Sequence, residues 1–137
     1  MKFVKSLLIV FIALLSLNAT AREAVPIVNY DDIAVATNSG KAPSAEQVKQ
    51  AIIAAASNKG WSIAHQADGQ LLATLVVRNK HTIVVSIACA ADKYSLRYKD
   101  SINMKFEERD GQQLIHPYYN KWVLDLKDAI RIELLKL

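Results

Sequence analysis

The chain is poor in the residues from which small proteins build disulfides and metal sites. Cys89 is its single cysteine, so no disulfide can form within the chain and thiolates cannot supply a structural zinc site. Its neighbours in IVVSIACAA are apolar and include no cation that would lower the pKa of the thiol. We therefore interpret Cys89 as a small buried hydrophobic residue. A reactive thiol or an intermolecular disulfide is the alternative.

Local sequence motifs of enzymes are missing as well. His65, His81 and His116 are far apart, and no two residues of ligand type have the helical spacing of zinc proteases. There is no G-x-S-x-G motif, and the four glycines are scattered as single turn residues, so no phosphate-binding loop forms from sequence neighbours. The pairs Asp31-Asp32 and Glu107-Glu108 lie in polar, turn-like stretches. The sequence disfavours catalysis, and we expect neither a metal nor a cofactor.

Long apolar runs are absent beyond Ala21. Before it, Lys2 and Lys5 precede an almost unbroken apolar run of eleven residues, 7–17, and Ala19-Thr20-Ala21 supplies the small residues of a cleavage site. A membrane anchor is the alternative, but a span needs about 20 apolar residues. We expect residues 1–21 to be a cleaved signal peptide and the mature chain to be periplasmic or secreted, not an integral membrane protein.

The excess of positive charge is small once that segment is removed. The formal charge of the whole chain is +4, and loss of Lys2 and Lys5 lowers it to +2. This charge is a weak argument for a nucleic-acid partner, and export weakens it further, so we expect none. The remaining length suits one domain with a single core.

Two helices are predicted, one near each end of that domain. Residues 22–43 are expected to form an extended arm or edge strand followed by a loop, because Pro26 argues against a central strand. Ser44 and Gln47 fit a capping box, which predicts a helix over about 45–59. Pro117 can open a second helix that continues to about residue 136.

Four strands are predicted between the helices. Residues 61–65, 71–78, 82–89 and 94–106 alternate with a period of two, whereas 107–113 are expected to be a solvated loop. Asp100 interrupts an otherwise apolar face, which predicts a bend or bulge. Strands grouped between two helices predict an α+β two-layer sandwich over residues 44–137: a four-stranded antiparallel meander with both helices on one face.

Two groups of side chains are candidates for function. Basic residues are expected on the open sheet face, where they would attract anionic lipid headgroups or an acidic envelope protein; a solvated face that keeps the strand soluble is the alternative. Aromatic residues are expected between the second helix and the sheet, as a pocket or as a structural cluster. The basic residues are Arg78, Arg97, Lys99 and Lys105, and the aromatic ones are Tyr94, Tyr98, Tyr119 and Trp122.

The stretch IHPYYNKWVLDL, residues 115–126, predicts how the second helix begins and packs. Tyr119 and Trp122 share one helical side with Val123 and Leu126. Trp122 is therefore expected to be the buried anchor. His116 is expected to cap the helix, and Asn120 to bond with the Ser101–Asn103 segment.

Several segments of the chain together resemble a group of small proteobacterial envelope proteins, many of them predicted lipoproteins. The motif is YSLRY at 94–98, then Ser101 with Asn103, then IHPYYNKW at 115–122; VKQAII, Gly60-Trp61 and ATLVVRNKHTIVVSI accompany it. The resemblance covers about residues 44–135. It implies a fold and a periplasmic compartment, and it carries no catalytic residue. This chain departs from the group in having no cysteine near the cleavage site, which favours a free form.

These features predict an exported, non-catalytic binding or accessory module of the bacterial cell envelope. The alternative is a small ligand-binding protein or enzyme with a pocket between the C-terminal helix and the sheet. A third hypothesis is a self-associating structural protein.

Overall fold

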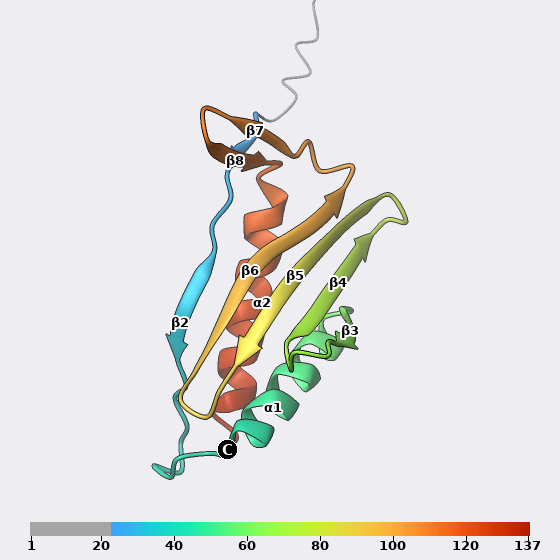
Figure 1. The fold of residues 1–137 in the computed structure, drawn as a ribbon. Coiled ribbons are helices and arrows are strands. Elements are labelled where there is room, and N and C mark those ends of the chain that lie inside the picture. Colours follow the sequence, from blue (N-terminus) through green and yellow to red (C-terminus); the bar gives the residue numbers. More distant parts are fainter. Residues whose placement is uncertain (1–22) are drawn as a thin grey trace, which may run out of the picture.

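The computed structural model describes residues 23–137, so the predicted signal segment lies outside the described residues. Within these described residues, two helices and eight strands follow one another in an α+β arrangement (Figure 1). In chain order the elements are β1 Val25–Pro26, β2 Tyr30–Ala34, α1 Ala45–Asn58, β3 Ser62–His65, β4 Leu71–Val77, β5 His81–Cys89, β6 Lys93–Ile102, β7 Glu107–Arg109, β8 Gln112–Ile115 and α2 Tyr118–Leu134.

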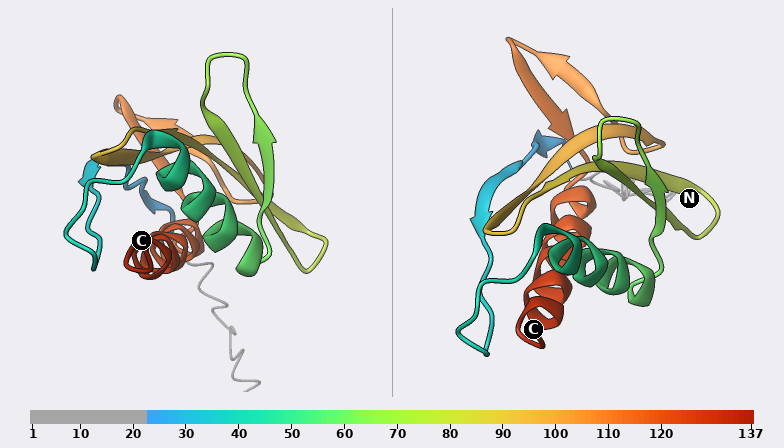
Figure 2. Two further views of the ribbon diagram at one scale, coloured as in Figure 1. Left: turned by 90° about the horizontal axis from the view of Figure 1, so that it is seen from below. Right: turned by 60° about the horizontal axis from the view of Figure 1, so that its bottom comes forward.

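The main sheet is antiparallel and has five strands in the order β2-β6-β5-β4-β3. Strands β3 to β6 form the expected meander, and both helices lie on one face of the sheet (Figures 1 and 2). The α+β class is thus confirmed. The four-stranded layout is wrong, because the arm supplies β2, which pairs with the free edge of β6.

A second, three-stranded sheet has the order β1-β8-β7. The expected loop at 107–113 is therefore wrong: β7 and β8 form a hairpin in which Arg109 pairs with Gln112. Asp110 and Gly111 connect the strands with φ of 53° and 76°. Positive φ at both central residues matches the twist of a hairpin, and Asp-Gly is a preferred sequence for it.

The first helix begins at the predicted capping box, which is confirmed. The Gln47 amide donates to Ser44 Oγ (3.1 Å), and the Ser44 amide donates to Gln47 Oε1 (2.9 Å). These bonds satisfy two backbone donors that the first turn leaves without helical partners.

The core fills the space between the two helices and the inner face of the main sheet. Burial of these apolar side chains is the main force that holds the two layers together. The largest fully buried members are Tyr119, Ile52, Leu71, Ile83, Ile87, Leu96, Ile115, Leu126, Ile130 and Leu134.

A bulge interrupts β6 where Asp100 predicts one. Tyr98 and Asp100 pair with consecutive residues of β5, so Lys99 is the extra residue. Side chains beyond the bulge exchange faces. Ser101 lies inward, where its Oγ is 2.8 Å from the Tyr98 hydroxyl, whereas Ile102, expected on the apolar face, is 59 % exposed.

Asparagine side chains fasten the arm to the rest of the fold. Asn120 Oδ1 accepts from the Val28 amide and its Nδ2 donates to the Pro26 carbonyl, both at 3.0 Å. Asn29 Oδ1 accepts from the Tyr98 amide at 2.8 Å. The predicted contact of Asn120 with the Ser101–Asn103 segment is therefore wrong, because this amide holds the segment between β1 and β2.

Candidate functional site

The four basic residues predicted for the sheet face lie in different surroundings. Arg97 is on the outer face of β6, where its Nη1 lies 2.6 Å from Asp31 Oδ1 of β2. Lys93 is also beside a carboxylate, with Nζ 3.6 Å from Asp32 Oδ1. The arm thus brings two acidic residues against the strand and neutralises much of its positive charge.

Arg78 and Lys105 lie outside the strands, at the end of the sheet where α2 begins. Arg78 is in the β4–β5 turn and Lys105 follows β6, each exposed with a φ of 54°. Lys99 is exposed at the bulge. Across residues 23–137 the structure records no ion pair for these three side chains.

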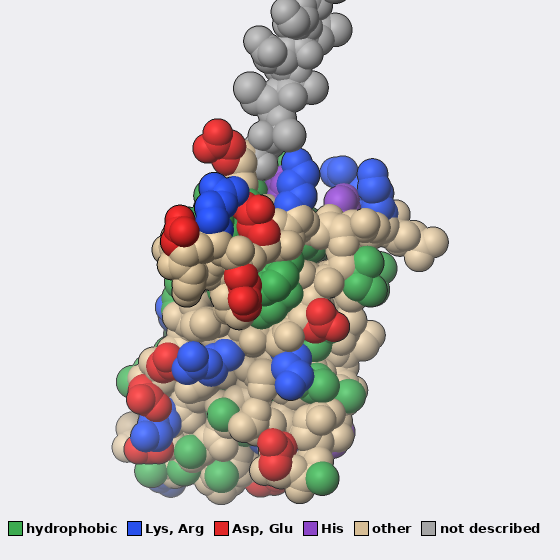
Figure 3. Space-filling view, turned by 45° about the horizontal axis from the view of Figure 1, so that its top comes forward, with side chains coloured by type: hydrophobic (Ala, Val, Ile, Leu, Met, Phe, Trp, Pro, Cys, Tyr) green, Lys and Arg blue, Asp and Glu red, His purple; other side chains and the backbone are tan. Residues whose placement is uncertain are grey.

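Two adjoining hollows lie at this end, which we call the basic end. Its members are the cations Arg78, Lys80, Lys105 and Lys121 and the rings of His81, His116, Tyr118 and Trp122. The larger hollow, about 220 Å³, is bounded by Arg78 and Lys121, and the smaller, about 60 Å³, by Met104. His81, Tyr118 and Trp122 line both. Figure 3 shows Lys, Arg and His side chains gathered at the top of the view.

Hydrogen bonds hold the loops of the basic end together. His81 Nδ1 lies 2.8 Å from the Asn103 carbonyl oxygen, and Asn103 Nδ2 donates to the Lys80 carbonyl at 2.9 Å. The β4–β5 turn and the segment after β6 are thereby fixed side by side. The basic end is built from three parts of the chain that are distant in sequence.

The start of α2 supplies the rings. His116 Nδ1 accepts from the Tyr118 amide at 3.1 Å, as expected for a cap, and the two rings are 4.7 Å apart. Tyr118 also contacts Trp122, with ring centroids 5.7 Å apart. Lys121 Nζ lies 6.0 Å from the centre of the Tyr118 ring. Trp122 is only partly buried, so the buried anchor of this helix is Tyr119 and not Trp122.

The four aromatic residues predicted as one group occupy three places. Tyr98 and Tyr119 pack edge to face with centroids 5.5 Å apart, and Phe106 stacks on Tyr98 at 5.0 Å. Trp122 belongs to the basic end. Tyr94 lines a separate pocket between β2 and α2.

Tyr119 has an unusual hydroxyl. The side chain is completely buried, and its oxygen has no hydrogen-bond partner among the described residues. Burial raises the pKa of Tyr119, with smaller contributions from Tyr98 and Tyr30. The phenol therefore stays neutral, and its position inside the core leaves it no contact with a ligand.

Reactive groups are few in the described part of the chain. Residues 23–137 hold no cluster of three His, Cys, Asp or Glu that would bind a metal ion. Cys89 is free and half-buried, and burial raises the pKa of its thiol, against a smaller lowering by Lys49. A raised pKa reduces the thiolate population and with it nucleophilic reactivity.

Residues 23–137 thus form a small α+β domain with cations and aromatic rings gathered at one end. In those residues neither helix has the length and apolar character needed to cross a bilayer. No family model matches the chain, and neither the curated proteins nor the solved structures give a match.

The sequence predicted Arg78 and Lys105 on the open sheet face, whereas both lie at the basic end. Lys80 and Lys121 were not among the predicted site residues. The available signal was the run RNKH at 78–81, a short turn with three basic residues. Nothing local in the sequence connects that turn to Lys121.

Proposed function

We propose that the protein is an exported, non-catalytic module of the bacterial cell envelope whose basic end binds anionic lipid headgroups. One observation carries the proposal. Arg78 and Lys121 come from distant parts of the chain, and both line the same hollow as Trp122. The expected signal segment supports export, and the resemblance to envelope proteins supports the compartment.

Electrostatics favour this end of the molecule over the sheet face. Each Lys or Arg near an anionic leaflet contributes about 1 kcal/mol of attraction. The four cations of the basic end have no ion-pair partner in residues 23–137, whereas Arg97 on the sheet face is paired with Asp31. The first turn of α2 carries no acidic residue, so the positive end of the helix dipole adds to this potential.

Tyr118 and Trp122 give the basic end a second property of membrane-binding surfaces. Both are partly buried, and tyrosine and tryptophan rings favour the headgroup region, where one side is apolar and the other wet. Carboxylates also lie near this end, since Glu107 and Glu108 follow Lys105 by two and three residues and Figure 3 shows acidic side chains beside the basic ones. Asp125 is one turn beyond Lys121, and the Asp100 carboxylate accepts from the Ser101 amide at 2.8 Å.

Sedimentation with lipid vesicles tests the proposal. We expect the protein to co-sediment with vesicles containing phosphatidylglycerol and not with phosphatidylcholine alone, and to dissociate as salt is raised. The double variant Arg78→Glu, Lys105→Glu should lose about 2 kcal/mol or more of binding free energy, roughly a 30-fold drop in affinity.

The matched control is Lys41→Glu, Lys59→Glu, which makes the same change in net charge at exposed positions before and after α1. It should bind as the unmodified protein does. Equal weakening in both double variants would show that net charge alone drives binding. Absence of binding to phosphatidylglycerol at low salt would reject the lipid and favour an acidic protein partner.

A further inference from the structure

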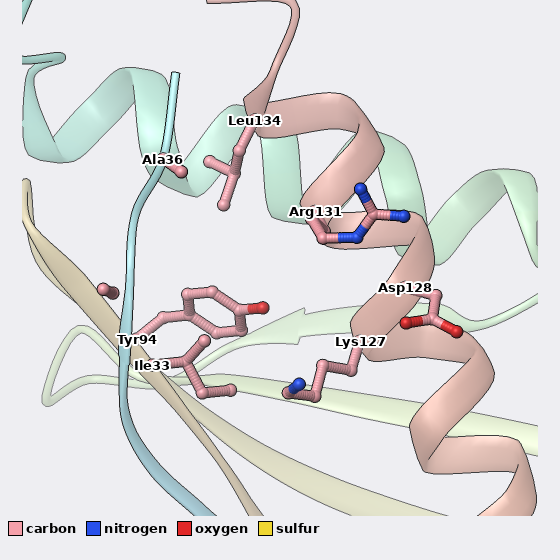
Figure 4. Close-up of a pocket in the computed structure, with 8 residues that line it drawn as sticks. Ile33, Ala36, Tyr94, Lys127, Asp128, Arg131 and Leu134 are labelled. Atoms are coloured by element: carbon pink, nitrogen blue, oxygen red, sulfur yellow. The ribbon is translucent and has the colours of Figure 1, made fainter. Parts of the chain in front are cut away.

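A pocket of about 130 Å³ lies between β2 and α2 and is independent of the basic end. Its apolar wall consists of Ile33 and Ala36, from β2 and the chain after it, and Leu134 near the end of α2. Tyr94, at the start of β6, also lines it. Figure 4 shows these side chains around the space between the strand and the helix.

Tyr94 offers a polar group that the protein itself does not use. The residue is only 2 % exposed, and its hydroxyl makes no hydrogen bond within residues 23–137. In Figure 4 the hydroxyl is directed across the pocket toward α2. The hydroxyl borders the pocket and is not enclosed in the core, unlike that of Tyr119, which is the one fully buried side-chain oxygen or nitrogen without a partner in residues 23–137. An acceptor on a ligand in the pocket would satisfy this hydroxyl.

The helix contributes positive charge to the same space. Lys127 Nζ lies 5.1 Å from the centre of the Tyr30 ring, and Figure 4 shows the Lys127 side chain extending from α2 toward Ile33. Arg131 follows one turn later, and the Asp128 carboxylate opposes these two cations. None of the three forms an ion pair in the described part of the chain. The rim therefore carries one net positive charge.

We propose that this pocket binds a monocarboxylate with a short branched apolar tail. The tail would contact Ile33, Ala36 and Leu134, while the carboxylate accepts a hydrogen bond from Tyr94 and lies beside the Lys127 ammonium. The proposal does not rest on the lipid-binding function of the basic end.

Size and charge both select this class of ligand. A cavity of about 150 Å³ lined by apolar side chains holds one benzene, so the pocket suits a tail of about four to six carbon atoms. The Asp128 carboxylate opposes the second negative charge that a phosphate dianion would bring. Burial raises the pKa of Tyr94 to about 12, with a smaller contribution from Asp128, so its hydroxyl remains a donor.

Titration of the purified protein with 3-methylbutanoate tests the proposal, with binding followed by calorimetry and by amide chemical shifts. We expect saturable binding that shifts the resonances of Ile33, Ala36 and Leu134. The neutral isostere 3-methylbutanamide and the tailless acetate should each bind about tenfold more weakly. The amide lacks the negative charge, and acetate lacks the apolar tail.

Single substitutions test the Tyr94 hydroxyl and the Lys127 ammonium one at a time. Tyr94→Phe keeps the ring and should weaken 3-methylbutanoate about tenfold, and Lys127→Gln should do the same. Lys59→Gln is the matched control, because it removes the same charge at an exposed position after α1 that borders neither this pocket nor the basic end, and it should leave the affinity unchanged. Absence of saturable binding, or equal affinity in Tyr94→Phe, overturns the proposal whatever the vesicle experiment shows.

Titration with N-acetyl-leucine distinguishes two sources of the carboxylate, a peptide C-terminus and a free acid. Tighter binding than that of 3-methylbutanoate points to the C-terminal residue of a peptide, because the acetylated amide mimics the preceding peptide bond. Weaker binding points to a free acid. Either result retains the carboxylate as the recognised group.

Discussion

At the scale of single residues, one buried side-chain oxygen in residues 23–137 has no hydrogen-bond partner. The Tyr119 hydroxyl is enclosed by the core, while the Tyr98 hydroxyl beside it bonds with Ser101 Oγ at 2.8 Å. The two tyrosines pack edge to face and therefore share their aromatic surroundings. They differ in hydrogen bonding. This pair allows the energy of a hydroxyl to be measured with and without a hydrogen bond.

We predict that Tyr119→Phe stabilises the protein by about 1 kcal/mol, because an unsatisfied buried group costs about 1–3 kcal/mol. Tyr98→Phe, the matched control, should instead lose about 1 kcal/mol, since it removes a formed bond. Urea unfolding followed by circular dichroism measures both. A loss of stability in Tyr119→Phe would show that its hydroxyl has a partner in solution.

At the scale of elements, local patterns predicted the helices better than the edges of the sheets. The capping box starts α1 at its predicted place because its bonds join residues three apart. The bulge at Lys99 is signalled by Asp100, but the exchange of faces beyond it moves Ile102 from the expected apolar face to the exposed one. The Asp-Gly pair at 110–111 marked the β7–β8 hairpin, although the surrounding charges suggested a loop.

The connection between the arm and α2 depends on one side chain. Asn120→Ala removes two hydrogen bonds to the backbone of Pro26 and Val28, and we predict a loss of about 1–2 kcal/mol, since each bond contributes about 0.5–1.5 kcal/mol. Urea unfolding gives the free energy. Hydrogen exchange at the Val28 amide should become faster.

Asn120→Asp provides the control for this prediction. It keeps the acceptor for the Val28 amide but loses the donor to the Pro26 carbonyl, so its exchange at Val28 should stay slower than in Asn120→Ala. Equal exchange rates in both variants would mean that the bond to Val28 does not hold the arm.

At the scale of the whole molecule, the arm joins the two sheets. β1 pairs with β8 in one sheet and β2 with β6 in the other. Ile27, Tyr30, Ile33 and Val35 pack against the core from this segment. The arm is therefore a structural part of the domain, and its β2 is an edge strand, one of the two alternatives that the sequence predicted for residues 22–43.

We predict that a chain starting at residue 44 is about 4 kcal/mol less stable than one starting at residue 23. Four partly buried apolar side chains, each contributing about 1 kcal/mol, are lost. The exposed edge of β6 should also promote self-association. Urea unfolding and sedimentation at several concentrations measure the two effects. Unchanged stability would show that residues 44–137 fold independently of the arm.

The two proposed binding surfaces also emerge only at this scale. Alternation along one strand grouped Arg97 with Lys99 and Lys105, but the arm pairs Arg97 with Asp31, and Lys105 lies beyond the end of β6. The helix then brings Lys121 to Arg78 at one end and Lys127 to Tyr94 at the other. Neither the proximity of Lys121 to Arg78 nor that of Lys127 to Tyr94 follows from their spacing in the sequence.

The sequence by itself determined the α+β class, the start of α1, the meander and the bulge, because these depend on contacts between near neighbours or on a simple alternation of side chains. Tertiary structure decided the pairing of β2 with β6, the second sheet and the composition of both surfaces. Each of these joins segments from opposite ends of the chain. Their association depends on burial and edge pairing across the fold, which no local pattern of residues records.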